Sequence, residues 1–122
     1  MTLLEIKTPE TKVLGSVYRD GVHAPSGDLV GTVNQVLDQR YQLQRSMSYK
    51  KDISRVTNVE SYAIKCVVVI GRVPANPDEK KSLELFRNNL NDVLVVTFDE
   101  LLEKLRHLHT FLKEPPDPLS ER

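Results

Sequence analysis

The sequence predicts a single α/β domain, and three observations support that class. Strand-like and helix-like segments alternate along the 122 residues. The composition, 39% hydrophobic and 28% charged with seven prolines and five glycines, is typical of a globular chain. A chain of this length buries about two-thirds of its unfolded surface, which is enough for one core but not for two. We therefore expect one domain over residues 1–113, followed by a disordered tail over 114–122.

The first elements surround a long loop. Residues 1–7 (MTLLEIK) read as a strand that ends at Thr8-Pro9, because proline lacks an amide donor and disfavours helix before it. Residues 8–27 form a connection punctuated by Gly and Pro, with room for a short strand or hairpin near residues 13–18. Ser26 can cap a helix that runs to about residue 47, since its apolar positions recur with a period near 3.6.

A polar connector and a buried strand come next. Residues 48–61 are polar and basic, without a clear period. Residues 62–70 (YAIKCVVVI) are β-branched and almost continuously apolar, so we expect a central strand covered on both faces. Gly and Pro in residues 71–77 then predict a loop.

The last third repeats the alternation of helix and strand. Residues 78–91 predict a helix and residues 92–97 a short buried strand. Thr97-Phe-Asp-Glu100 fits a capping box, in which the Thr hydroxyl and the Glu carboxylate satisfy free amides at the start of a helix. That helix should span about residues 99–113, since the prolines after Glu114 cannot continue it.

Charge and cysteine content exclude several classes of protein. The formal net charge is zero, but residues 1–76 hold 10 Lys and Arg against 7 Asp and Glu (+3), whereas residues 77–122 hold 7 against 10 (−3). A polyanion should therefore approach the first part. Cys66 is the single cysteine, which excludes an internal disulfide. The longest apolar run, residues 66–70, is far shorter than the ~20 residues of a membrane helix. No signal-peptide pattern precedes it, so we expect a cytoplasmic protein without membrane contact.

Glu5 and Lys7 are the first candidates for chemistry. Positions i and i+2 of a strand face the same side, about 6–7 Å apart at the backbone. The carboxylate of Glu5 could ligate Mg²⁺, while the ammonium of Lys7 could hold a water or stabilise charge on a phosphate. The alternative is an exposed ion pair at a sheet edge, worth about 0–1 kcal/mol.

One face of the first long helix is polar but uncharged, which suggests that it faces a polar cleft. This face carries Thr32, Gln35, Gln39 and Gln42. A basic stretch follows, which either is a solvated surface or contacts a phosphate backbone. It comprises Arg40, Arg45, Lys50, Lys51 and Arg55.

The order of these motifs is more informative than each one alone. The Glu-x-Lys-x-Pro strand leads to a helix that starts Ser-Gly-Asp-Leu29 and carries Gln35. A strand ending Val-Val-Ile-Gly-Arg72 follows, and then Val-Leu-Val-Val-Thr-Phe-Asp-Glu-Leu-Leu102. This series resembles the Shedu family of bacterial anti-phage nucleases, within the PD-(D/E)xK or restriction-endonuclease-like superfamily. The resemblance spans residues 2 to about 105.

The resemblance implies a restriction-endonuclease-like mixed sheet flanked by helices and hydrolysis of phosphodiester bonds in DNA with Mg²⁺ or Mn²⁺. It implies that Glu5 ligates the metal and that Lys7 is the catalytic lysine. Gln35 matches the glutamine that helps to place the metal or the nucleic-acid backbone. Gln39 falls where related nucleases often carry a tyrosine.

The nucleic-acid contacts that we expect beside this centre come from Gln39, Arg40, Lys50 and Lys51. The superfamily pattern also has an acidic residue, usually Asp, on a strand before Glu-x-Lys, and Glu5 follows the first Met by only four residues. Asp20 and Asp28 come later and cannot take the same topological place. The sequence therefore predicts an N-terminally truncated nuclease domain that is inactive alone.

Its strand edge would then pair with a second copy in a homo-oligomer or with a partner chain. Two other interpretations remain open. One is a non-catalytic binding or regulatory module that keeps the nuclease fold. The other is an unrelated α/β protein in which Glu5 and Lys7 form an ion pair at a sheet edge.

Overall fold

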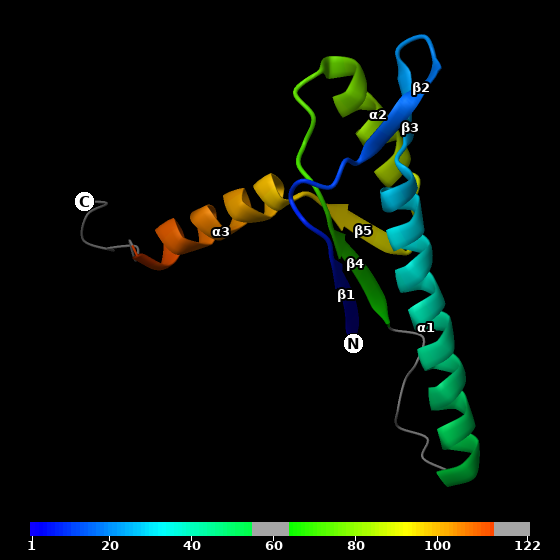
Figure 1. Cartoon of the computed structure of the whole chain (residues 1–122). Coiled ribbons are helices and arrows are strands. Elements are labelled where there is room, and N and C mark those ends of the chain that lie inside the picture. Colours follow the sequence, from blue (N-terminus) through cyan, green and yellow to red (C-terminus); the bar gives the residue numbers. More distant parts are fainter. Residues whose placement is uncertain (55–63, 114–122) are drawn as a thin grey trace.

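A computed structural model describes residues 1–54 and 64–113 of the chain. Its main sheet has three parallel strands, β1 (Thr2–Ile6), β4 (Lys65–Val69) and β5 (Val93–Val96), in the order β1-β4-β5. The strand expected within residues 62–70 is central, as predicted, and its register with β1 places Glu5 beside Val68. Tyr62 and Ala63 lie outside the described residues. Figure 1 shows the three strands side by side with both helical crossovers.

Helix α1 (Gly27–Ser54) connects β1 to β4 and covers one face of the sheet. Ser26 caps it, as expected: its hydroxyl accepts a hydrogen bond from the Leu29 amide at 3.0 Å and donates one to the Lys12 carbonyl at 2.6 Å. The helix continues to Ser54 rather than ending near residue 47. Residues 48–54 contain no Gly or Pro to stop it, so the weakly periodic connector remains helical.

A β-hairpin occupies the long loop between β1 and α1. Strands β2 (Leu14–Arg19) and β3 (Val22–Pro25) pair antiparallel as a separate two-stranded sheet. Gly21 turns the chain with φ +72°, a conformation that glycine adopts without strain. The antiparallel pairing expected of a mixed sheet is therefore confined to this hairpin among the described residues.

Helix α2 (Pro77–Arg87) connects β4 to β5 and packs beneath the hairpin. The sequence analysis missed its cap: the Asn76 side-chain oxygen accepts from the amides of Asp78 (2.8 Å) and Glu79 (3.3 Å). The helix ends at Arg87, earlier than the predicted residue 91. After it the Asn89 and Leu90 amides bond to carbonyls three residues back, those of Phe86 and Arg87 at 3.3 Å, in place of the four-residue pattern of an α-helix.

The core lies between the sheet, the two crossover helices and the first residues of the hairpin. It is formed by Val13, Leu14, Leu29, Val33, Val36, Cys66, Val68, Ile70, Leu83, Val93 and Val95. The sheet's other face is largely open in the described part of the chain, which corrects the expectation of cover on both faces. Leu4, Ile6 and Leu94 are 56%, 58% and 60% exposed there, although Val69 remains buried between its neighbours. The crossover from β1 to β4 and the crossover from β4 to β5 have the same hand, so α1 and α2 lie on the same face of the sheet.

Helix α3 (Phe98–Lys113) extends away from the rest of the molecule, and none of its residues is buried (Figure 1). The predicted capping box is confirmed. The Thr97 amide donates to Glu100 Oε1 at 3.1 Å, and the Glu100 amide reaches Thr97 Oγ1 at 3.4 Å. Arg87 on α2 also donates to Glu100 Oε1 at 2.6 Å and to Glu100 Oε2 at 2.7 Å. These hydrogen bonds attach the first turn of α3 to the domain.

The ion pair between Arg87 and Glu100 shifts the pKa of both groups. Hydrogen bonding by Arg87 lowers the pKa of Glu100 to about 2, and Glu100 in turn raises the pKa of Arg87.

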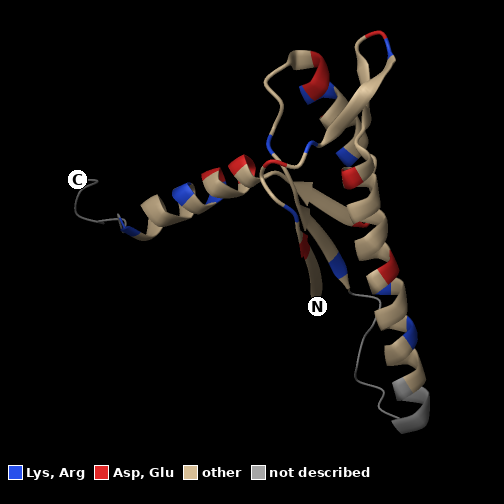
Figure 2. Ribbon diagram, viewed as in Figure 1, with Lys and Arg blue, Asp and Glu red and all other residues tan. Residues whose placement is uncertain are grey.

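No helix in the described ranges is long and apolar enough to cross a membrane. Figure 2 shows that charged residues are spread over the helices, whereas the sheet carries few of them.

Candidate functional site

Glu5 and Lys7 lie at the carboxyl end of β1 and face the same side, as the spacing predicts. Lys7 Nζ is 3.9 Å from Glu5 Oε1, and the side chains of Lys7 and Glu5 are 40% and 21% exposed. The Lys7 amide donates to the Val69 carbonyl at 2.8 Å, which prolongs the strand geometry by one residue beyond Ile6. The tertiary structure therefore holds the ammonium beside the carboxylate.

A cavity of about 370 Å³ joins Lys7 to the start of α1. Gln35 lines this cavity together with Lys7, so the structure brings two of the predicted site residues together. Gly27 and Gly31 also line it, and a Cβ added at either would have open space around it. The other lining residues are Thr11, Asp28 and Thr32. The polar face of the helix thus borders a cleft along part of its length.

Thr32 and Asp28 both line the cavity, but they differ in whether the side chain is free to bind a ligand. Thr32 is buried, and its hydroxyl donates a hydrogen bond to the Asp28 carbonyl at 2.6 Å. The Thr32 hydroxyl is therefore used in a hydrogen bond within α1. The Asp28 carboxylate is exposed and makes no hydrogen bond or ion pair with the other described residues. Ser26, not Asp28, caps the helix, which leaves Asp28 free to face the cavity.

Sequence reasoning excluded Asp28 because it follows the Glu-x-Lys strand in the chain. The sequence feature that could have identified Asp28 is its spacing to Thr32 and Gln35, which follow four and seven residues later. This spacing places all three residues on one helical face. The fold brings that face to the end of β1, so a carboxylate reaches the cavity without a preceding strand.

Of the predicted nucleic-acid contacts whose side chains are described, neither Gln39 nor Arg40 lines this cavity. Gln39 is exposed, one helical turn beyond Gln35. Arg40 forms an ion pair of 3.3 Å with Asp92 before β5, and its side chain is 21% exposed. The side chains of Lys50 and Lys51 lie outside the described part of the chain.

The donor set suits Mg²⁺ in chemical type. Glu5 and Asp28 offer carboxylate oxygens and Gln35 an amide oxygen, and Mg²⁺ commonly binds one or two carboxylates together with waters and substrate phosphates. Within residues 1–54 and 64–113, no group of three or more His, Cys, Asp or Glu side chains is placed to hold a metal. A metal at this site would therefore depend on oxygen atoms from water and substrate.

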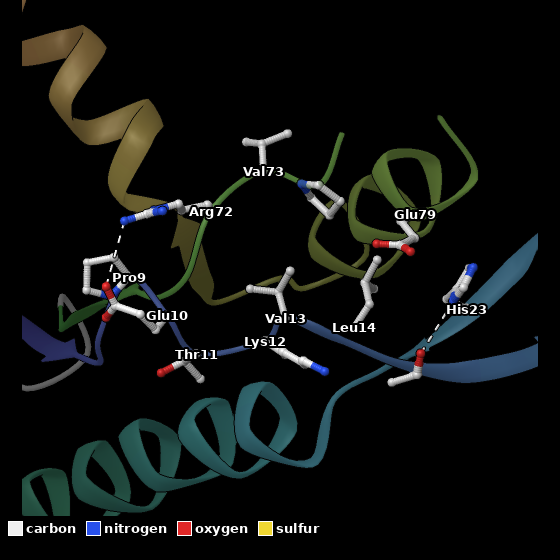
Figure 3. A pocket seen from close by; sticks show the side chains of 12 residues that line it. Pro9, Glu10, Thr11, Lys12, Val13, Leu14, His23, Arg72, Val73 and Glu79 are labelled. Carbon is white, nitrogen blue, oxygen red and sulfur yellow. Dashed lines mark hydrogen bonds and ion pairs between the residues drawn. The ribbon is translucent and has the colours of Figure 1, made fainter. Parts of the chain in front are cut away.

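A second cavity of about 450 Å³ lies on the other side of Thr11, which lines both cavities. Figure 3 shows Arg72 and Glu10 together at one end of this cavity and His23 at the other. Arg72 and Glu10 form an ion pair of 3.7 Å, and His23 Nδ1 lies 3.4 Å from the Gly15 carbonyl oxygen. Its lining contains acidic and basic side chains in similar number, so it presents no surface of one sign. Two cavities therefore flank the loop after β1.

Comparison with known proteins identifies the family. Residues 1–102 match the family model described as "Shedu protein SduA, C-terminal". The chain belongs to this Shedu family. It is also 37% identical over 120 residues to the Shedu protein SduA of Bacillus cereus (strain B4264). That alignment covers 91% of this chain and 31% of the relative, so the chain spans about a third of the relative's length.

The part of the chain that matches the Shedu model contains the entire candidate site. It begins before β1, includes α1 and β4, and ends at Leu102 in the first turns of α3. The match therefore extends over Glu5, Lys7, Asp28 and Gln35, whereas most of α3 lies beyond it.

Proposed function

We propose that this Shedu family member is the nuclease module of a bacterial anti-phage defence protein and hydrolyses phosphodiester bonds in DNA. The observation that carries the proposal is the cavity in which Lys7, beside Glu5, meets Gln35. The opening carries the Lys7 ammonium, the Gln35 amide and the Asp28 carboxylate, with Glu5 beside Lys7, and such groups can hold a metal and stabilise charge on a phosphate. Family membership supports the same function.

The side chains divide into metal-holding groups and a charge-stabilising group. Glu5, Asp28 and Gln35 would hold Mg²⁺ or Mn²⁺ through their oxygen atoms. When bound, the metal supplies a Lewis acid for the phosphate and a more acidic water. Lys7 binds a non-bridging phosphate oxygen and stabilises the negative charge that grows there during the in-line displacement. Glu5, at 3.9 Å, positions the ammonium of Lys7.

We further propose that the domain is restriction-endonuclease-like. The Glu-x-Lys strand at the edge of a sheet, followed by a helix that carries Gln35, supports this assignment. Because β1 is the edge strand of the described sheet, its free side can pair with a further strand. That pairing would complete a larger sheet.

Cleavage of duplex DNA in Mg²⁺ or Mn²⁺ tests the proposal. We expect Glu5→Gln and Lys7→Met each to reduce cleavage at least about 100-fold, the range that a positioned catalytic group contributes. Glu79→Gln and Lys81→Met are matched controls, because they have the same Glu-x-Lys spacing on α2. These two variants should cleave like the wild type. Cleavage that survives both site substitutions would exclude this site.

Metal binding provides a second readout that does not depend on cleavage. Titration of Mn²⁺, followed by electron paramagnetic resonance, should show weaker binding in Asp28→Asn than in the wild type. Asp38→Asn, an exposed residue later on the same helix, is the control and should bind like the wild type. Equal affinity in all three proteins would remove Asp28 from the metal site.

A non-catalytic binding module is the second candidate function. It is favoured by the lack, within the described residues, of three ligating side chains around one point. This alternative predicts salt-sensitive DNA binding without cleavage at any metal concentration, and with no effect of Glu5→Gln on affinity. Metal-dependent cleavage would exclude it.

A further inference from the structure

A pair of threonine hydroxyls lies in the turn that follows β1. Thr8 Oγ1 is 2.9 Å from Thr11 Oγ1, and either hydroxyl can be the donor. Neither hydroxyl has another hydrogen-bond partner among the described residues. Two hydroxyls that share one hydrogen bond have two protons but place only one between them. The pair therefore has one proton that is free for a further acceptor.

The Thr11 side chain faces the cavity of about 370 Å³ that contains Lys7. Thr11 lines this cavity, whose wall on the side of α1 includes Asp28 and Gln35. Thr11 is half-buried, and Figure 3 shows its side chain pointing toward α1. The hydroxyl therefore belongs to the same opening as the Lys7 ammonium.

Backbone contacts hold this turn against the end of β4. The Thr8 carbonyl accepts from the Thr11 amide at 3.2 Å and from the Gly71 amide at 3.1 Å. Gly71 has φ +61°, and a Cβ there would lie 2.5 Å from the Thr11 carbonyl oxygen, so this approach requires glycine. The Lys7 amide donates to the Val69 carbonyl at 2.8 Å. Lys7 and Thr11 are thus both fixed to the strand beside β1.

The acidic neighbour of Thr11 is held away from this cavity. Glu10 forms an ion pair of 3.7 Å with Arg72, and both side chains line the cavity of about 450 Å³ instead. The loop therefore presents a hydroxyl and the Lys7 ammonium to the smaller cavity. Hydroxyl and ammonium groups are both common donors to the oxygen atoms of a DNA phosphate.

We propose that the Thr11 hydroxyl donates a hydrogen bond to a non-bridging oxygen of the DNA phosphate that Lys7 binds, and that the Thr8 hydroxyl donates to Thr11. This inference rests on the proposed nuclease function. Each hydroxyl then donates one hydrogen bond, and the Thr11 oxygen also accepts one. Thr11 is a substrate-binding residue, whereas Thr8 is a positioning residue that directs the Thr11 proton toward the phosphate.

Cleavage of duplex DNA in Mn²⁺ by the complete chain and matched variants tests the proposal. Thr11→Val keeps the size and branching of the side chain and should lower kcat/KM at least about tenfold, the contribution of one hydrogen bond to a charged group. Thr8→Val also breaks the hydroxyl pair but leaves the Thr11 hydroxyl, so it should lower kcat/KM less. Thr11→Ser retains the hydroxyl and should cleave nearly as fast as the wild type. Thr2→Val, exposed at the start of β1, is the control and should cleave like the wild type.

A purely structural role for the hydroxyl pair predicts a different pattern. Thr8→Val and Thr11→Val would then lower the free energy of unfolding in urea equally, and they would reduce cleavage equally. Equal cleavage by these two variants, or wild-type cleavage by Thr11→Val, would overturn the proposal. If Lys7→Met abolishes cleavage in the same experiment, the nuclease function would stand without Thr11.

DNA binding in the absence of divalent metal gives a readout that does not depend on cleavage. Fluorescence anisotropy of a labelled duplex should show binding by Thr11→Val that is at least about threefold weaker than binding by Thr2→Val, because one phosphate contact is lost. This result in a wild type that cleaves no DNA would exclude hydrolysis but support the phosphate contact. Unchanged affinity in Thr11→Val, or a wild type that binds no duplex, would overturn the contact.

Discussion

Replacing Glu100 by glutamine should destabilise the domain through the loss of one negative charge. Hydrogen bonding by Arg87 lowers the pKa of Glu100 to about 2, against an ordinary value of 4.5. A difference of about 2.5 pH units corresponds to about 3.4 kcal/mol at 1.36 kcal/mol per unit. The Glu100 side chain is 31% exposed, so solvent screening reduces the expected loss to about 1–2 kcal/mol.

The pH dependence of this loss has a definite sign. The folded-state pKa lies below the unfolded value, so the stabilisation is complete above about pH 4.5. It disappears as the pH falls through about 2. The difference in unfolding free energy between wild type and Glu100→Gln should therefore be constant from pH 7 to pH 5 and should shrink toward pH 2.

Urea denaturation followed by circular dichroism measures this difference at each pH, provided that the m-value is unchanged. Glu103→Gln on the same helix is the control, because Glu103 contacts only His107 among the described residues and both are exposed. Its curve should follow that of the wild type. A Glu100→Gln protein as stable as the wild type at pH 7, or a difference that persists undiminished to pH 2.5, would refute this account of the ion pair.

Three further predictions concern the loop after β1 and the core. Gly71→Ala should cost at least about 2 kcal/mol in urea denaturation, because Gly71 has φ +61° and a Cβ there would lie 2.5 Å from the Thr11 carbonyl oxygen. Ser26→Ala should cost about 1–2 kcal/mol in the same assay, since the Leu29 amide would lose its cap, and unchanged stability would contradict that role. Cys66 should react with a thiol reagent far more slowly in the native protein than in urea, because burial raises the pKa of its thiol. Equal rates would contradict its burial.

Local sequence patterns were sufficient to predict much of the secondary structure. The caps and periods of the helices depend on neighbours three and four residues away, so the Ser26 cap and the Thr97 capping box were identified from the sequence. The early end of α2 was missed because Asn88 and Asn89 do not interrupt the apolar period. The true length of α1 was missed because residues 48–54 carry only two apolar residues, Tyr49 and Ile53, which is too short a pattern to indicate a helix.

The site was only partly predictable. Glu5 and Lys7 share a face because a strand alternates with period two, which needs no tertiary information. That Gln35 reaches the same cavity follows from the crossover that places α1 over β1, and Asp28 becomes a candidate only through that packing. That Arg40 contacts DNA stays a prediction, whereas its ion pair with Asp92, just before β5, joins residues far apart in the chain and could not be predicted from local pattern.

The sequence by itself determined the alternation of strands and helices and the Glu-x-Lys pair, since each depends on residues close together in the chain. It also determined the resemblance to the Shedu family, because the order of motifs along a chain can be read without a structure. Only the tertiary structure decided which side chains share a cavity and which apolar surfaces remain uncovered. The two crossovers place both helices on one face of the sheet, and the contact between Arg87 and Glu100 directs α3 outward. Both outcomes depend on contacts between segments distant in sequence, which periodicity cannot encode.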